Sequence, residues 1–181
     1  KIGCYYGLMI FGAVVYERGM EIAENKKHRL VLLCAAWLAA FLFLLPSRQT
    51  GLSATFLDVG QGDGIVLRSE SHTILVDCGS SNSYVDAGSV AADTLQSAGV
   101  RRLSAVVVTH YHADHTNGLT EVLTRLPVDT LYLPDIEDEY GVRGRLVSLA
   151  ERRGIAVVFV TVPTRITLGE AALTIYPPLQ A

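Results

Sequence analysis

The residues best suited to chemistry are concentrated in one short segment, 106–119, with the sequence VVVTHYHADHTNGL. Within six positions it holds His110, His112, Asp114 and His115. Imidazole and carboxylate groups are ligands that Zn²⁺ and similar divalent ions accept. Three of the five histidines of the chain lie in this hexapeptide, so a metal site explains it better than a solvated polar loop does.

A buried strand is expected to position these ligands. Residues 103–109, LSAVVVT, form a dense β-branched run that is typical of a strand packed between two layers. Side chains that follow the C-terminal end of such a strand can converge on one site. Because alternate residues point the same way, we expect His110 and His112 to share one ion. Asp114 and His115, one turn further on, are expected to reach a second.

The rest of residues 51–181 alternates strand and helix patterns. Apolar or alternating runs predict strands, and apolar positions at helical spacing predict helices. The predicted strands are 53–59, 64–68, 73–77, 103–109, 129–134, 155–162, 164–168 and 172–176, and the predicted helices are 86–98, 119–126 and 139–153. Alternation of this kind is typical of an α/β domain with a mixed sheet.

The string H-x-H-x-D-H after a buried strand resembles the metal motif of the metallo-β-lactamase superfamily, whose domains fold as an αββα sandwich. The resemblance implies that His110 and His112 bind a first metal and that Asp114 and His115 bind a second. It implies one or two divalent ions, with Zn²⁺ expected and Mn²⁺ as the alternative. It also implies hydrolysis by a metal-bound water whose pKa falls toward ~7, with Asp114 as the catalytic residue that orients or deprotonates this water.

Two further strings, TFLDVGQGDG at 55–64 and ILVDCG at 74–79, resemble the opening of the extracytoplasmic domain of ComEC-type competence proteins. These proteins are polytopic channels that bring transforming DNA into bacteria as a single strand. Similar openings also occur in free-standing and secreted hydrolases of the superfamily. The match after an apolar segment favours the competence proteins.

The glycines of the first string predict a tight turn with positive φ, from which Gln61 and Asp63 project polar groups. Shaping this turn and contacting the substrate or the metal ligands are equally open roles for the two residues. Asp77, at the end of its strand, is expected to support a metal ligand through a hydrogen bond rather than to bind metal. Cys78 is expected to be a small packing residue.

The resemblance covers roughly residues 53–181, about the first half of a superfamily domain. The second half of such domains normally supplies a further histidine, a bridging aspartate and a last histidine, and His28 and His72 cannot fill those places. We therefore expect residues 51–181 to be the N-terminal half of the sandwich, truncated at the C-terminus. A site of at most four ligands is expected to bind metal weakly and to hydrolyse little or nothing.

The first 50 residues differ in composition from the rest. They carry six Lys or Arg against three acidic residues, whereas residues 51–181 carry nine Arg against fifteen. The whole chain is 50% hydrophobic and 18% charged, which excludes disordered, collagen-like and coiled-coil classes. Apolar runs at 2–16 and 30–45 predict a transmembrane helical hairpin, with a buried helix pair and a signal peptide as weaker alternatives.

The basic connector of this hairpin predicts on which side of the membrane each part of the chain lies. Residues 17–29 hold four Lys or Arg, so the positive-inside rule places them in the cytoplasm. The domain from 51 onward is then expected on the outer face of a bacterial cell membrane. Because the apolar run starts abruptly after Lys1, we expect the chain to be a piece of a longer multi-pass protein.

Three functions remain open from the sequence. The first is the metal-dependent hydrolase domain of a DNA-uptake channel, expected to act as a nuclease on single- or double-stranded transforming DNA, with the rest of the channel as partner. The second is a membrane-anchored hydrolase of a small ester or envelope phosphodiester, and the third is a non-catalytic channel domain. The acidic excess counts against a strong DNA-binding surface. Four arginines of one predicted helix could form a local patch, but a solvated face is favoured: Arg143, Arg145, Arg152 and Arg153.

Overall fold

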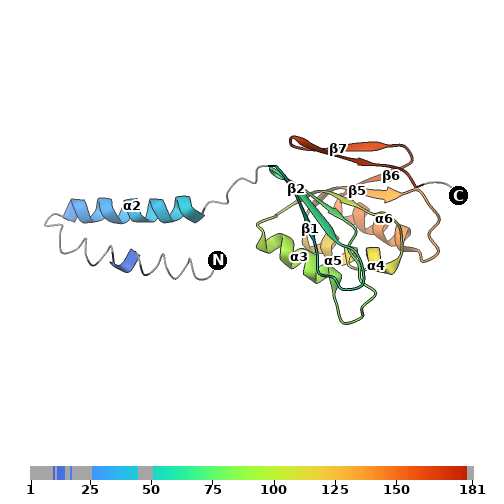
Figure 1. Cartoon of the computed structure of the whole chain (residues 1–181), viewed down its shortest axis with the longest axis horizontal. Helices are drawn as coiled ribbons and strands as arrows, with labels where there is room; N and C mark the ends of the chain where they lie inside the picture. The colour runs from blue at the N-terminus through green and yellow to red at the C-terminus, as the bar shows by residue number, and fades with distance from the viewer. Residues whose placement is uncertain (1–9, 11, 15–16, 18–25, 45–50, 179–181) are drawn as a thin grey trace. The chain divides into compact units, whose positions relative to one another are not determined.

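The computed structural model describes residues 10, 12–14, 17, 26–44 and 51–178. The chain divides into two compact units, Lys1–Ser47 and Arg48–Ala181, and each is described by itself (Figure 1).

The described part of the first unit is dominated by helix α2 (Lys26–Leu44), which contains most of the predicted span 30–45. Trp37 and Phe41 on this helix are exposed. Within the described part of the chain, no helix is both long and apolar enough to cross a membrane, so the structure does not support the transmembrane helix predicted at 30–45. The basic residues 26–29 belong to the helix itself, which leaves an uncharged part shorter than the ~20 residues of a usual span. The other predicted span, 2–16, lies mostly outside the described residues.

The second unit is built on a six-stranded mixed sheet in the order β1-β2-β3-β4-β5-β6. The strands β1, β2 and β3 pair in antiparallel fashion, and β3, β4, β5 and β6 pair in parallel. Their bounds are β1 (Leu52–Phe56), β2 (Ile65–Ser69), β3 (His72–Val76), β4 (Leu103–Val107), β5 (Val128–Pro134) and β6 (Ala156–Val160).

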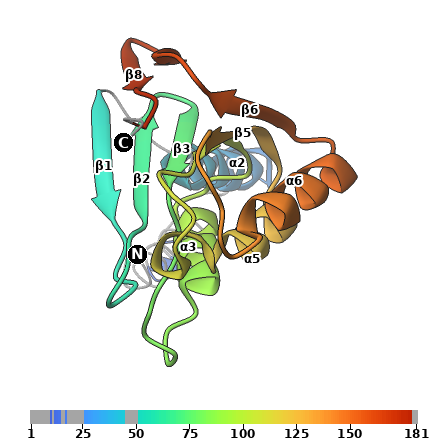
Figure 2. The same ribbon diagram turned by 90° about the vertical axis from the view of Figure 1, so that its right-hand side faces the viewer.

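Helical crossovers connect the parallel strands. They contain α3 (Ala87–Ser97), the short α4 (Ala113–Thr116) with α5 (Leu119–Arg125), and α6 (Val142–Arg153). Because the strand order advances in one direction and such crossovers are right-handed, the helices lie on one face of the sheet (Figure 2). Buried side chains of the sheet and of the helices form one core, including Leu75, Val106, Leu131, Leu95, Leu123 and Leu146.

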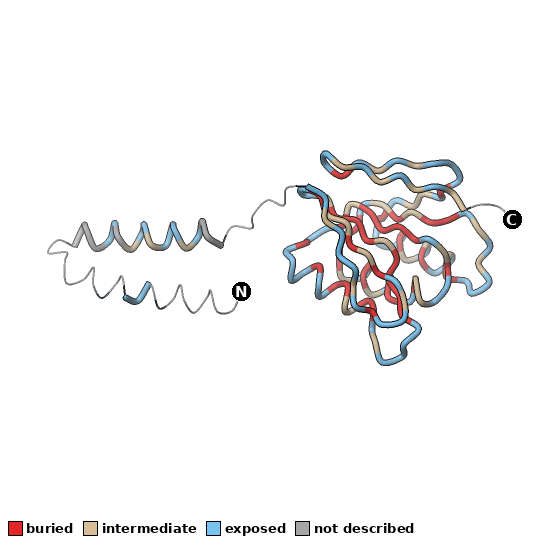
Figure 3. The backbone as a smooth tube through the Cα atoms, viewed as in Figure 1, coloured by how far each residue is buried: buried red, intermediate tan, exposed pale blue. Residues whose placement is uncertain are grey.

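A hairpin of β7 (Thr164–Leu168) and β8 (Ala171–Ile175) packs on the opposite face of the sheet. Leu168 of this hairpin is buried against Ile74, Ala105 and Val107. Buried segments therefore run through the middle of the unit, with exposed segments around them (Figure 3). Strand β4 is covered on both faces, as its β-branched run predicted.

The sequence predicted these elements closely, and the α/β class with a mixed sheet is confirmed. Several boundaries differ, and β1 for example ends at Phe56 rather than at 59. Residues 113–116, for which no helix was predicted, form the single turn of helix α4. Helix α6 starts at Val142 rather than at 139, because Gly141 adopts a left-handed φ of 65° and the Asp138 carboxylate accepts the backbone N–H of Arg143 at 2.6 Å.

We expect Leu131→Ala to lower the free energy of unfolding by about 2–5 kcal/mol, because this fully buried side chain of β5 would leave a cavity. Urea unfolding followed by circular dichroism measures the change. Leu52→Ala on β1 is the control, since Leu52 is 60% exposed. Equal losses in the two variants would contradict the core as described.

Candidate metal centre

The predicted ligands follow the C-terminal end of β4, beside the end of β3. Val76 of β3 is paired with Val107 of β4, so Asp77 and Thr109 leave the sheet at the same edge. The backbone N–H of Asp77 donates to the carbonyl of Val107 at 2.9 Å. Parallel pairing thus brings together residues that lie 32 positions apart.

The three histidines form one cluster. The ring centroids of His110 and His112 lie 4.7 Å apart, and those of His110 and His115 lie 3.9 Å apart. The Asp114 carboxylate lies 3.7 Å from Nε2 of His115. The structure thus gathers all four predicted ligands, but His110 lies closer to His115 than to His112, its expected partner.

The donor types of this cluster fit a borderline divalent ion. The present rotamers do not surround a common point, however. Among the described residues, no group of three or more His, Cys, Asp or Glu side chains is arranged to hold a metal ion. Binding an ion would therefore require the imidazole rings to turn.

Asp77 anchors the cluster through three hydrogen bonds. Its carboxylate accepts the backbone N–H of Thr109 at 2.8 Å, the Thr109 hydroxyl at 2.5 Å and Nδ1 of His115 at 2.9 Å. The residue is 3% exposed and adopts a φ of 54°, in the left-handed region. Non-glycine residues rarely adopt this region, although aspartate tolerates it better than most. The hydrogen bonds offset that strain.

This network sets the tautomers of two histidines. Because a carboxylate only accepts, Nδ1 of His115 carries the proton and Nε2 keeps its lone pair. The Thr109 hydroxyl gives its only proton to Asp77, so it accepts a hydrogen bond from Nδ1 of His110, 3.0 Å away. Nε2 of His110 therefore also has a free lone pair. Thr109 was not predicted as a site residue from the sequence. Its position between the buried strand and His110 was the signal that could have indicated its role.

The surroundings of His110 favour its neutral form. Burial lowers the pKa of His110, and the neighbouring His115 and His112 lower it further. Asp77 and Asp114 act in the opposite direction without cancelling these effects. A neutral imidazole is the form that binds a metal ion.

The residues of the TFLDVGQGDG string lie against the histidine segment. The Asp63 carboxylate is 3.5 Å from Nδ1 of His115, and its side chain is 57% exposed. The backbone N–H of Asp63 donates to the carbonyl of Asp114 at 3.0 Å. Gln61 instead contacts the neighbouring loop, where its carbonyl accepts the backbone N–H of Ser81 at 2.7 Å. Of these two residues, Asp63 therefore contacts the histidine cluster and Gln61 holds the adjoining loop.

The sequence predicted positive φ for the glycines of this string, and the structure shows it for one of the three. Gly60 has a φ of 71°, whereas Gly62 and Gly64 do not adopt positive values. Gly62 is required by close packing instead, because a Cβ there would lie 2.2 Å from the carbonyl oxygen of Gly79 and 2.7 Å from that of Asp114. A Cβ on Gly79 would in turn lie 2.5 Å from the backbone N of His115.

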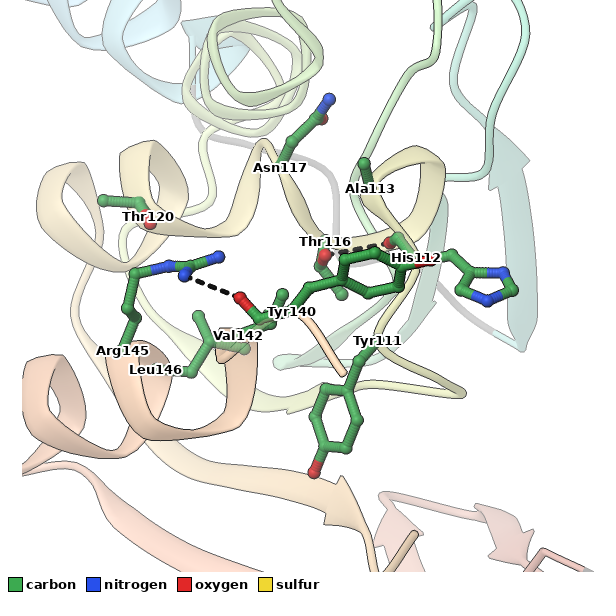
Figure 4. Close-up of a pocket in the computed structure, with 10 residues that line it drawn as sticks. All are labelled: Tyr111, His112, Ala113, Thr116, Asn117, Thr120, Tyr140, Val142, Arg145 and Leu146. Carbon is green, nitrogen blue, oxygen red and sulfur yellow. Dashed lines mark hydrogen bonds between the residues drawn. The ribbon is translucent and has the colours of Figure 1, made fainter. Parts of the chain in front are cut away.

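A cavity of about 590 Å³ opens beside His112 (Figure 4). The Tyr140 ring stands 6.2 Å from the His112 ring, centroid to centroid. The sequence did not indicate this cavity, because its lining comes from both the histidine segment and α6. The lining residues are Tyr111, His112, Ala113, Thr116, Asn117, Thr120, Tyr140, Val142, Arg145 and Leu146.

Cys78 plays no part in the cluster. Burial, followed by the nearby Asp86 and Asp77 carboxylates, raises the pKa of the Cys78 thiol to about 12. Its Sγ donates to the carbonyl of Ala87 at 3.3 Å. The residue is therefore a packing residue with no tendency to form a thiolate, as the sequence indicated.

Residues 57–175 match the family model of the metallo-β-lactamase superfamily. The chain belongs to this superfamily. Members bind divalent metal ions, usually zinc. Hydroxyacylglutathione hydrolase of Aeromonas salmonicida is 36% identical over 69 residues, which are 38% of this chain and 24% of that protein.

Solved structures of metallo-β-lactamase-fold proteins are also similar to this superfamily member. A subclass B3 metallo-β-lactamase from a soil metagenome library has 16% identity and a TM-score of 0.49, covering 71% of this chain and 52% of the other. A diphosphatase of the PhnP family has 19% identity and a TM-score of 0.39, covering 62% and 41%. The chain spans about half the length of the solved structures it matches, and a quarter of the curated hydrolase.

We expect Thr109→Val to change the tautomer of His110, because the variant removes the hydroxyl that accepts from Nδ1. Nitrogen NMR of the metal-free protein, about two units above the ordinary histidine pKa, reports the protonated ring nitrogen. Nδ1–H is expected for His110 and His115 in the wild type, and only His115 should retain it in the variant. Thr109→Ser is the control, and an unchanged His110 in Thr109→Val would contradict the proposed network.

The lowered pKa of His110 predicts a pH-dependent stability. Between the ordinary value of ~6.5 and the lower folded value, the unfolded chain binds more protons at this residue than the folded chain does. The free energy of unfolding should therefore fall as the pH drops through this range. Urea unfolding of metal-free protein at a series of pH values measures the slope. His110→Gln should flatten it, and an identical slope in the variant would contradict the prediction.

Proposed function

We propose that this superfamily member is a metal-dependent hydrolase that uses the histidine cluster at the end of β4. The observation that carries the proposal is the convergence of three imidazoles and the Asp114 carboxylate at one edge of the sheet. A bound ion would lower the pKa of a water molecule and polarise the scissile bond. One or two divalent ions are proposed, Zn²⁺ first and Mn²⁺ as the alternative.

Each residue of the cluster has a proposed role. His110 and His112 hold the first ion, and Asp114 and His115 hold the second. The Asp114 carboxylate also orients the attacking water and accepts its proton. Asp77 acts through His115 and through Thr109, keeping the Nε2 atoms of His115 and His110 available as ligands.

For the substrate, a small ester or phosphodiester is one candidate. The relative from Aeromonas salmonicida is named for the hydrolysis of hydroxyacylglutathione. The cavity beside His112 has a volume of about 590 Å³, within the range of small-molecule sites. The excess of acidic residues in 51–181 is compatible with such a substrate.

A second candidate is the outer-face hydrolase domain of a DNA-uptake channel in a bacterial membrane. It is supported by the TFLDVGQGDG string, whose Gly62 and Asp63 pack directly against the histidine segment. Transforming DNA would be the substrate and the rest of a polytopic channel the partner. With fifteen acidic residues against nine arginines, the domain would need metal ions to offset repulsion of the phosphates.

Equilibrium dialysis of the protein against Zn²⁺ or Mn²⁺ at a series of concentrations tests the proposed site, and it also detects weak binding. The wild type should bind one or two ions, and the double variant His110→Ala/His112→Ala should bind at least one fewer. His72→Ala is the matched control, because His72 lies on β3 outside the cluster and its removal should leave the metal content unchanged.

Hydrolysis assays on the same samples separate the substrates. Plasmid DNA, single-stranded DNA, a small phosphodiester and a thioester are compared in the wild type and the double variant. Cleavage that requires His110 and His112 supports the proposal, and the preferred substrate decides between the two candidates. Metal content equal to that of the wild type, or cleavage that survives the double substitution, would refute it.

A further inference from the structure

The cavity beside His112 contains a single cationic residue among its lining residues, Arg145 of α6. Arg145 is exposed, and its Nη1 donates to the carbonyl of Tyr140 at 2.9 Å (Figure 4). This bond orients the guanidinium and leaves most of its N–H donors free.

Arg145 is among the arginines of the described domain that have no carboxylate partner, in contrast to Arg102, Arg125 and Arg143. Arg125 is paired with Asp93 at 2.5 Å, and Arg143 is 3.4 Å from the Asp135 carboxylate. In the described part of the chain, no carboxylate lies within 4 Å of the Arg145 guanidinium. Its charge therefore remains available for a ligand in the cavity.

The rest of the cavity combines apolar surface with neutral polar groups. Tyr111, Val142 and Leu146 are buried and provide apolar surface. The Tyr111 hydroxyl already donates to the carbonyl of Pro134 at 2.8 Å, so it is not available to a ligand. Such a lining suits a ligand with an apolar body and one anionic group.

We propose that Arg145 binds an anionic oxygen group of the substrate, a phosphate or a carboxylate, while the apolar part of the substrate packs on Tyr111, Val142 and Leu146. The planar guanidinium matches the geometry of both kinds of oxygen group. Because His112 lines the same cavity, a ligand held in this way lies beside the histidine cluster. This inference rests on the proposed function, since it assigns the substrate class of that site.

Binding of small probes to metal-free protein tests this assignment independently of the metal. Phenyl phosphate and benzoate are the anionic probes, and phenol is their neutral counterpart. NMR titration gives the dissociation constants and shows whether the resonances of Thr120 and Leu146 shift. We expect at least one anionic probe to bind and Arg145→Met to weaken it about tenfold or more, with phenol unaffected.

Arg152→Met is the matched control, because Arg152 lies on the same helix, is exposed and does not line the cavity. It should leave probe binding unchanged. Equal loss in both variants would indicate unspecific attraction and overturn the proposal, as would unchanged binding in Arg145→Met or no probe binding by the wild type. If Arg145→Met fails to fold, Arg145→Lys replaces it, with an intermediate loss expected.

The comparison of probes also identifies the anion. Tighter binding of phenyl phosphate assigns a phosphate ester, and tighter binding of benzoate assigns a carboxylate. Because the titration uses metal-free protein, failure of metal binding would refute the proposed function without changing this result. Loss of probe binding alone would leave the metal-dependent activity standing.

Discussion

The geometry of the histidine cluster depends on one buried carboxylate. Asp77 ends β3 and holds both the backbone and the side chain of Thr109, the residue that leads from β4 into the histidines. The same carboxylate fixes the ring of His115. Its left-handed backbone conformation is unfavourable for a side chain of this kind, and the hydrogen bonds to Thr109 and His115 compensate for it.

Close backbone contacts, together with Asp77, hold the histidine segment in place. Gly62 and Gly79 lie so near the carbonyls of Ala113 and Asp114 that no side chain could stand at either position. Asp63 and Cys78 donate backbone hydrogen bonds to this segment, to Asp114 at 3.0 Å and to His115 at 2.8 Å. The loops after β1 and β3 thus hold the histidine segment by main-chain contacts, which leave its side chains free to bind a ligand.

The architecture separates the core from the site. Helices cover one face of the sheet and the β7–β8 hairpin covers the other, so β4 is fixed from both sides. The candidate ligands follow it at the sheet edge, and α6 supplies Arg145 to the cavity beside His112. A rigid strand with a polar edge permits variation in the loops and helices around one cluster, and such variation can change the substrate without changing the ligands.

Local patterns in the sequence determined the elements and the candidate ligands. The β-branched run before His110 and the helical spacing of residues 86–98 reflect periodicities within one strand or helix, so the sequence alone predicted β4 and α3. The close spacing of the three histidines likewise singled out the site. Hydropathy was a weaker guide to the first unit, where it predicted a membrane span at 30–45 that the structure does not support.

The sequence predicted a supporting hydrogen bond from Asp77 to a candidate ligand, but the tertiary structure alone decided which residues Asp77 contacts. It brought Asp77 to Thr109 and to His115, which lie 32 and 38 positions away. It also decided the left-handed backbone of Asp77 and the place of Arg145 beside His112. These features come from contacts between segments far apart in the chain, and such contacts leave no periodic signal in the sequence. Only the pairing of β3 with β4, and the packing of α6, could establish them.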